Sequence, residues 1–416
     1  MKFQVFDFLS SCPSAESSKL AACQRLNMMK ILFFFSLFIV FYSYVGYGIV
    51  IYLLVTLKHL FSRRKDIHQP VAFEPEITLI VAAYNEAGLI ENKIVNSLNL
   101  KYPAGKLHWI FVTDGSTDET PEIVSRFSQI RLLHQPERKG KAGALNRAMK
   151  FVETPFVIFS DSNTQLNPEA VQEIVKHYTD ARVGGVAGEK KIVKKIAENA
   201  AASGEGFYWR YESQLKKLDS AFYSVVGAAG ELFSLRTSLY QEAAEDTIIE
   251  DFVLSLQICM AGFVIRYEPN AYALESASIS MQEEQKRKVR IAAGAFQAMQ
   301  ILKGLFNVFR FPVLAFQFIS HRILRWTFCP LCLIICFFSN AVLVYDHAGR
   351  FYTVVFLCQT VFYAMAFYGW IFANMHRRMK LLYVPYYFLF MNLSVFLGFY
   401  RFLRNKQSSV WEKAKR

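Results

Sequence analysis

The sequence predicts an α/β domain with a mostly parallel sheet, placed between α-helical transmembrane segments near the two ends of the chain. Three observations lead to this fold class. Residues 31–57 carry no charged side chain, and a second apolar block fills the last quarter of the chain. The polar stretch between these blocks alternates short apolar runs, rich in β-branched residues, with helical stretches. That alternation is typical of an open parallel sheet covered by helices on both faces.

The first apolar block predicts a membrane anchor over residues 29–60, preceded by an N-terminal tail over 1–28. A helix needs about 20 apolar residues to cross a hydrocarbon layer of roughly 30 Å, and this block is longer than that. A signal peptide has a shorter apolar region, nearer the start of the chain, and a small-residue cleavage site. We therefore expect the anchor to be retained.

The second apolar block predicts two to three membrane spans within residues 327–403, followed by a basic tail over 404–416. The candidate spans cover 327–345, 351–373 and 381–400. Pro385 and Asn392 interrupt the last of these, so a re-entrant or interfacial position is an alternative for it. Residues 281–326, which end in a mixture of aromatic and cationic side chains, predict interfacial amphipathic helices before the first of these spans.

Much of the net charge of +13 lies beside the apolar blocks. The flanking cations are Lys58, Arg63, Arg64, Lys65, Arg377, Arg378 and Lys380. Lys and Arg beside membrane helices mark the cytoplasmic side and favour contact with anionic membrane lipid. We therefore expect a multi-pass protein of the cytoplasmic (inner) membrane, with a cytoplasmic central domain and no nucleic-acid partner. Three full crossings after that domain would place the basic tail outside, against the same rule.

The central domain is expected over residues 70–280. Its continuous apolar run at 77–84 suits a strand buried on both faces of a parallel sheet. Further strands are expected at 108–113, 130–133 and 156–160, with helices at 89–98, from Thr117 onward, and at 143–151.

Polar clusters follow three of these strands, at 84–86, 114–118 and 161–163. In open parallel sheets the ligand binds beyond the carboxyl ends of the strands. A lone carboxylate there, such as Asp114 or Asp118, is equally well explained as a helix cap. Three clusters in succession indicate a site for something cationic, or for a hydroxyl-rich sugar and a metal-bound diphosphate.

Five segments carry a family resemblance by their order and spacing. They lie at 83–86, 112–118, 139–146, 160–163 and 249–251. Over roughly residues 76–300 the chain resembles the family 2 glycosyltransferases, and its membrane segments resemble those of the polysaccharide synthases in that family. The resemblance implies a GT-A fold, which is Rossmann-like, and transfer of a sugar from a nucleotide donor with inversion at the anomeric carbon.

The resemblance also implies a site for the UDP-sugar donor. The residues expected around the nucleoside are Tyr84, Asn85, Glu86 and Asp114, where amide and carboxylate groups can recognise uracil and ribose. Lys141 lies in a glycine-flanked loop and is expected to contact the donor diphosphate. A solvated surface lysine is the alternative at that position.

Asp161 and Asn163 stand at the Asp-x-Asp positions of the family, which hold Mg²⁺ or Mn²⁺ against the diphosphate. Such hard cations take oxygen ligands and neutralise the charge that develops on a departing nucleotide. Asn163 is a neutral ligand where the family usually carries a carboxylate, so weaker metal binding is expected.

Three residues are expected to serve catalysis. Asp251, the second member of an acidic pair with Glu250, is expected to deprotonate the attacking hydroxyl as general base. Arg290 matches the arginine of a Gln-x-x-Arg-Trp motif and is expected to stabilise the leaving diphosphate. An acidic pair also favours the positive end of the helix expected at 252–260, which is the structural alternative for Glu250 and Asp251.

The acceptor is expected beside a strand rich in small residues over 226–236, where Gly230 and Glu231 would lie close to it. Arg287 stands at the glutamine position of the same motif and is expected nearby. Ile291 replaces the tryptophan on which an acceptor sugar stacks in polymerising enzymes, and this weakens the prediction of processive synthesis.

The sequence thus predicts a membrane-bound inverting glycosyltransferase that elongates a glycan or modifies a lipid-linked acceptor in cell-surface polysaccharide assembly. A non-processive transferase acting on polyprenyl phosphate is one alternative. A non-catalytic subunit that binds nucleotide or glycan is another. A transporter is disfavoured because the apolar spans hold few ionisable groups. Export partners, the donor sugar and the linkage are left open.

Overall fold

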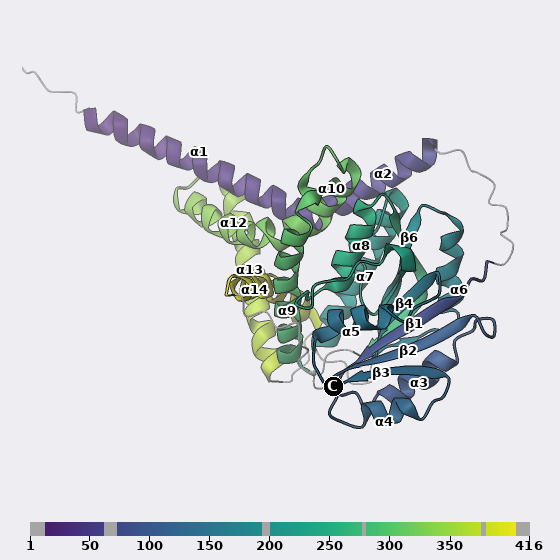
Figure 1. Ribbon diagram of the computed structural model, residues 1–416. Helices are drawn as coiled ribbons and strands as arrows, with labels where there is room; N and C mark the ends of the chain where they lie inside the picture. Colours follow the sequence, from purple (N-terminus) through teal and green to yellow (C-terminus); the bar gives the residue numbers. More distant parts are fainter. Residues whose placement is uncertain (1–12, 62–72, 194–199, 277–279, 376–379, 405–416) are drawn as a thin grey trace, which may run out of the picture.

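The computed structural model describes residues 13–61, 73–193, 200–276, 280–375 and 380–404. It contains an α/β domain beside a group of long helices contributed by both ends of the chain (Figure 1). The basic segments at 63–65 and 377–378, the start of the N-terminal tail and the tail from 405 onward lie outside the described residues.

The first half of the sheet follows the sequence prediction closely. Four parallel strands lie in the order β3-β2-β1-β4. They are β1 (Ile77–Ala83), β2 (Leu107–Asp114), β3 (Ile130–Gln135) and β4 (Phe156–Asp161). Every residue of β1 is buried, as expected for a strand covered on both faces. The polar clusters after β1, β2 and β4 therefore meet at one edge of the sheet.

The second half of the sheet mixes strand directions, and the sequence prediction covered little of it. The order continues as β7-β6-β8-β5, with β7 antiparallel to both β4 and β6, and β8 parallel to β6. The strands are β5 (Gln165–Leu166), β6 (Val183–Val193), β7 (Leu232–Arg236) and β8 (Val264–Ser276). The strand expected over 226–236 is shorter than predicted, because residues 226–231 form a loop before β7.

Helices cover both faces of the sheet. One apolar cluster joins β1 and β2 to the first set of helices, and a second cluster joins the opposite face to the other set. The first set is α3 (Ile90–Leu98), α4 (Thr120–Ser125) and α6 (Ala170–Val175). The other set is α5 (Gly140–Met149) and α8 (Glu250–Met260). Short 3-10 turns lie at Lys176–Thr179, Thr237–Leu239 and Lys303–Phe306.

Four helical stretches in the described part of the chain are long and apolar enough to cross a membrane. The first is a continuous helical stretch made of α1 (Pro13–Phe41), a π-helical turn η1 (Tyr42–Gly46) and α2 (Tyr47–Phe61). The others are α12 (Phe328–Tyr345), α13 (Arg350–Asn374) and α14 (Lys380–Leu403). Helix α1 packs on α12, where Phe33, Cys336 and Leu343 share one buried cluster.

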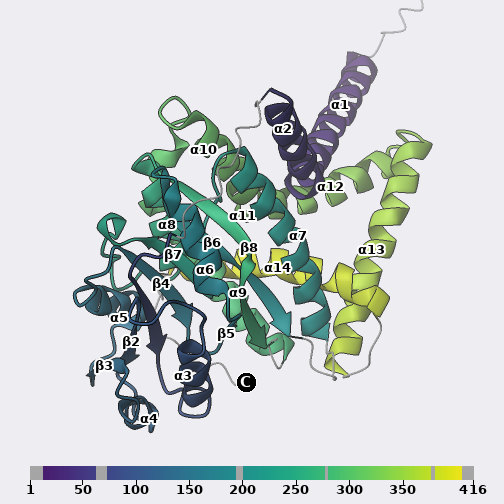
Figure 2. The same cartoon turned by 90° about the vertical axis from the view of Figure 1, so that its right-hand side faces the viewer.

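Helix α14 runs across the view in Figure 2, whereas α13 runs from top to bottom. Helix α14 lies along α9 (Met281–Ile301). Gly398 of α14 fits directly against Ala292 of α9, since a Cβ atom at Gly398 would lie 2.5 Å from the Ala292 Cβ. This position resembles the interfacial alternative that Pro385 and Asn392 suggested.

Two further helical stretches connect the sheet to the membrane helices. Helix α7 (Ala200–Phe222) packs between α2 and the sheet. After α9, the chain forms α10 (Pro312–Phe318), the π-helical turn η5 (Ile319–Ile323) and α11 (Leu324–Trp326). Tyr42 in η1 donates a hydrogen bond to Ser320 in η5 over 2.9 Å, so the two π-helical turns lie against each other.

A buried polar network joins these helices. His321 of η5 is fully buried, with its Nδ1 atom 2.6 Å from Asp219 and its Nε2 atom 3.3 Å from Glu212, both on α7. The Tyr47 hydroxyl of α2 donates to the same Asp219 carboxylate. Three segments far apart in the sequence are therefore tied together at one place.

Candidate active site

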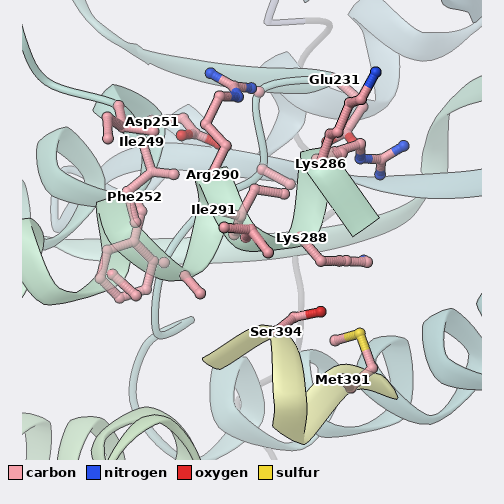
Figure 3. Close-up of a pocket in the computed structure, with 18 of the residues that line it drawn as sticks. Glu231, Ile249, Asp251, Phe252, Lys286, Lys288, Arg290, Ile291, Met391 and Ser394 are labelled. Carbon is pink, nitrogen blue, oxygen red and sulfur yellow. The ribbon is translucent and has the colours of Figure 1, made fainter. Parts of the chain in front are cut away.

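A large cavity of about 1480 Å³ lies between the carboxyl edge of the sheet, α9 and α14. Figure 3 shows part of its lining, with Asp251 and Arg290 on one side and Met391 and Ser394 of α14 across from them. Nearly all residues that the sequence predicted for the site line this cavity. They are Tyr84, Asn85, Glu86, Lys141, Asp161, Asn163, Gly230, Glu231, Glu250, Asp251, Arg287 and Arg290.

Lys141 occupies the centre of an acidic group in this cavity. It lies in the first turn of α5, and its ammonium lies 2.8 Å from the Asp161 carboxylate and 3.1 Å from that of Glu250. Burial alone would lower the pKa of Lys141, but the surrounding carboxylates raise it well above its ordinary value. Lys141 is therefore a fixed positive charge, and the surface-lysine alternative does not describe its buried position.

Asp251 lies in the first turn of α8, beside Glu250. Burial, and after it the neighbouring Glu250, raise the pKa of Asp251 to about 7 against the opposing effect of Lys141. A carboxylate with a pKa near neutrality is suited to accept a proton at physiological pH. Its place at the start of a helix also fits the capping alternative, and the two roles do not exclude each other.

The loop before β7 brings the backbone close to this acidic group. Gly227 has a φ of +87°, and a Cβ atom there would lie 2.0 Å from the Phe252 ring. A Cβ atom at Gly230 would lie 2.5 Å from the Lys141 ammonium and 3.4 Å from the Asp251 carboxylate. These contacts explain why glycine stands at both positions.

Helix α9 supplies the opposite wall. Burial lowers the pKa of the Arg290 guanidinium, and Glu250 and Asp161 oppose this shift, so Arg290 faces the same carboxylates as Lys141. Arg287 lies one turn away, with its guanidinium 3.8 Å from Glu275. An arginine stays protonated even when its pKa falls somewhat, so both side chains bring positive charge to the cavity.

The ends of β1 and β2 form the far end of the cavity. The Asn85 side chain accepts a hydrogen bond from the Thr117 backbone over 2.8 Å, and Asn85 has a positive φ of 52°. The Arg138 guanidinium lies 3.4 Å from the centre of the Tyr84 ring. Arg138 lines the cavity but was missed by the sequence analysis, because it lies in an irregular loop without a motif of its own.

Asp114 is the predicted site residue that does not line the cavity. It is almost fully buried, and its carboxylate accepts hydrogen bonds from the backbone of Lys139 over 2.7 Å and of Gly140 over 3.0 Å. It therefore caps α5, which positions Lys141. The structure thus places Asp114 as a helix cap, and its predicted contact with the nucleoside is untested.

A second charged group surrounds Lys190 of β6. Its ammonium lies 2.6 Å from Glu231 and also pairs with Glu275. The Asn163 amide donates to Glu275 over 2.9 Å, so this group lies directly beside the Asp-x-Asp positions. The Glu231 side chain is thereby held in place rather than being an ordinary surface residue.

The residues at these positions fit a divalent cation bound together with a diphosphate. Asp161 offers a carboxylate and Asn163 an amide oxygen, and Mg²⁺ commonly takes one or two such ligands while substrate phosphates and water complete its shell. Among the described residues, no group of three or more His, Cys, Asp or Glu side chains is placed to hold a metal. A cation at this site would therefore depend on the donor for several of its ligands.

Further cationic side chains line the membrane side of the cavity, and no sequence motif indicates them. Lys216 of α7, Arg322 of η5 and Arg325 of α11 line it. The sequence predicts an interfacial position but no role for Arg322 and Arg325, and it carries no signal for Lys216. Glu212, Lys216 and Asp219 share one face of α7 at spacings of four and three residues, but a charged helical face is ordinarily exposed.

Comparison with known proteins agrees with this geometry. Residues 78–242 match the model of the family "Glycosyl transferase family 2". These residues form a family 2 glycosyltransferase domain. The match covers strands β1 to β7, Lys141, Asp161 and Gly230, whereas α8, β8, α9 and the membrane helices lie beyond it.

Curated relatives of this glycosyltransferase match most of its length. It is 25% identical over 320 residues to the poly-beta-1,6-N-acetyl-D-glucosamine synthase of Staphylococcus aureus strain MSSA476, covering 74% of this chain and 75% of the relative. It is 23% identical over 367 residues to the enzyme of the same name from Staphylococcus epidermidis, covering 80% and 86%.

A solved structure confirms the GT-A fold. The glycosyltransferase resembles the mannosyltransferase PcManGT from Pyrobaculum calidifontis, solved in complex with GDP-Man and Mn²⁺, with a TM-score of 0.68. The match covers 90% of this chain and 99% of the other, at 21% identity. The similarity therefore extends over the membrane helices as well as the sheet.

Proposed function

We propose that this glycosyltransferase transfers a sugar from a UDP-sugar to a hydroxyl group of a glycan or lipid-linked acceptor, with inversion at the anomeric carbon. One observation carries the proposal: Lys141, Asp251 and Arg290 converge in one cavity that reaches from the carboxyl edge of the sheet to α14. A nucleotide sugar and a membrane-associated acceptor can meet there.

The chemistry assigned to these residues is a single displacement. The acceptor hydroxyl oxygen forms a bond to the anomeric carbon, Asp251 takes the hydroxyl proton, and the bond from that carbon to the diphosphate oxygen breaks. The electron pair leaves on the diphosphate, where Lys141 and Arg290 offset the growing negative charge. Mg²⁺ or Mn²⁺ held by Asp161 and Asn163 would supply additional positive charge to the diphosphate.

The setting of the reaction is proposed to be the cytoplasmic face of the cytoplasmic membrane. The curated relatives are named as synthases of an N-acetylglucosamine polymer, which supports a role in exopolysaccharide assembly and makes UDP-N-acetylglucosamine the first donor to test. The solved structure contains GDP-Man, so GDP-mannose belongs in the same panel.

The test is nucleotide release by the full chain in nanodiscs, measured with UDP- and GDP-sugars in the presence and absence of Mn²⁺ or Mg²⁺. We expect metal-stimulated turnover of one donor, reduced at least about a thousandfold by Asp251→Asn because the base is lost. The product's anomeric configuration, read by NMR, tests inversion. Equal turnover by wild type and Asp251→Asn would overturn the assignment of the base.

A further inference from the structure

Lys216 is a buried cation that the proposed reaction does not use. It lies on α7, is 4% exposed and lines the cavity. Within the described part of the chain, no hydrogen bond or ion pair holds its ammonium, which lies 5.4 Å from the centre of the Trp209 ring. Burial lowers the pKa of Lys216, and the carboxylates of Glu212, Glu231 and Glu189 only partly oppose this shift.

Charged side chains of both signs surround Lys216. The Glu212 carboxylate forms an ion pair with Arg322 at 2.6 Å and accepts a hydrogen bond from Arg325 over 3.4 Å. Burial alone would raise the pKa of Glu212, but its cationic neighbours lower it well below the ordinary value, so Glu212 is ionised. Glu212 is thus engaged by both guanidinium groups, and the carboxylates of Glu231 and Glu189 act on Lys216 only from beyond ion-pair distance. An anion that enters the cavity could contact the Lys216 ammonium directly.

The cationic group formed by Lys216, Arg322 and Arg325 lies at a limited distance from Asp251, the proposed base. The Arg322 guanidinium donates to the backbone carbonyl of Val226 over 3.1 Å, and Gly230, four residues later, lies against Asp251. Four extended residues span at most about 14 Å, so the backbone positions of Val226 and Gly230 lie no further apart than this. A ligand that carries a sugar and a diphosphate has a length of the same order and can reach from Arg322 to Asp251.

The wall nearest the cationic group is largely apolar and comes from the membrane helices. Phe388, Met391 and Val395 of α14 line it, together with Tyr44, whose hydroxyl donates to Asn392 over 3.2 Å. In Figure 3, Met391 and Ser394 lie across the open cavity from Lys288 and Ile291. A ligand held here has an anionic group beside α7 and an apolar part beside α14.

We infer that Lys216, Arg322 and Arg325 bind the phosphate or diphosphate group of a lipid-linked acceptor, so that its sugar hydroxyl reaches Asp251. This inference rests on the proposed function and names the acceptor class for the same cavity. The lipid chain lies along α14. The arrangement differs from transfer to a polyprenyl phosphate itself, in which the phosphate oxygen would have to lie at Asp251.

The test uses the full chain in nanodiscs of zwitterionic lipid, without donor, and farnesyl diphosphate as the probe. We expect Lys216→Met to weaken its binding about tenfold or more, because a charge-assisted contact is lost, and Lys216→Arg to retain most of it. Lys217→Met is the matched control, since Lys217 is the adjacent, exposed residue of the same helix, and its binding should equal wild type.

Three further ligands identify the source of the anion and check the donor site. Farnesol, which lacks the diphosphate, should bind weakly and equally to all variants, and inorganic pyrophosphate should compete poorly because it lacks the apolar part. UDP binding measures the donor site, so a failed nucleotide assignment is distinguished from a failed acceptor assignment. Equal probe binding by Lys216→Met and Lys217→Met, pyrophosphate competing as well as the lipid, or Lys216→Met losing UDP binding instead would each overturn the inference.

Discussion

Asp251 connects the proposed reaction to pH. Its pKa is raised to about 7, mainly by burial, and a general base must be deprotonated to act. We therefore expect kcat/KM for the donor to fall about tenfold per pH unit below pH 7 and to reach a plateau above it. Initial rates between pH 5.5 and 8.5 check this, with circular dichroism to show that the fold persists. A rate that stays constant from pH 5.5 to 8.5 would contradict the role.

Gly230 controls the position of the Lys141 ammonium. A Cβ atom at Gly230 would lie 2.5 Å from that ammonium, which two carboxylates hold in place. We expect Gly230→Ala to displace Lys141 and to reduce kcat/KM for the donor roughly tenfold or more, while the melting temperature changes little. Gly88→Ala is the control, because nothing lies within 4 Å of a Cβ atom there. Matching kinetics for the two variants would argue against this role.

At the residue level, the sequence was informative wherever chemistry followed a strand. Lys141, Asp161 and Asp251 could be predicted because motifs placed them after strands or at a helix start. Arg138 and Lys216 could not, because their positions depend on how loops and α7 pack against distant segments. The Asp114 carboxylate accepts hydrogen bonds from the backbone at the start of α5, and its contact with the nucleoside stays a prediction.

At the level of elements, the contact between α9 and α14 links the membrane helices to the site. Gly398 packs on Ala292, which follows Arg290 by two residues and Arg287 by five along α9. We expect Gly398→Ala to push the helices apart, costing about 1–3 kcal/mol of stability and lowering kcat. Adding Ala292→Gly should restore part of both. Thermal unfolding and initial rates of the two variants check this, and purely additive effects would exclude a direct contact.

The elements themselves were predictable to different degrees. Strands β1 to β4 are short apolar runs, and their parallel pairing follows from the helices between them. Strand β6 contains glycines and three consecutive charged residues, Glu189 to Lys191, so its local sequence does not resemble a strand. Its pairing with β7 and β8, on both sides, supplies the stability that the local pattern does not indicate.

At the level of the whole molecule, the polar network around Asp219 joins α2, in the N-terminal helical stretch, to α7 and η5. We expect Tyr47→Phe to lower the free energy of unfolding by about 1.5–3 kcal/mol, since a hydrogen bond to a charged, buried carboxylate is lost. Unfolding in mixed micelles measures this. Tyr52→Phe is the control, because Tyr52 of the same helix is 60% exposed. Equal stability of both variants would mean that the network contributes nothing measurable.

The arrangement of α14 bears on how the whole chain sits in the membrane. If α14 lies at the interface along α9, two spans follow the central domain, and the basic tail returns to the cytoplasmic side. Composition alone left this open, because a helix of that length and hydropathy fits either position. Contacts with α9 are information that only the folded chain contains.

The packing of α1 on α12 also constrains how the protein is made. About 290 residues separate the end of α1 from the start of α12, and ribosomes add roughly 5–20 residues per second. The first helix therefore waits on the order of 15–60 s in the bilayer before its partner is synthesised, while the entire catalytic domain emerges. The uncharged stretch of 27 residues, which runs from the end of α1 through η1 into α2, allows the anchor to remain there alone. Insertion of the anchor therefore precedes, and does not depend on, assembly of the finished enzyme.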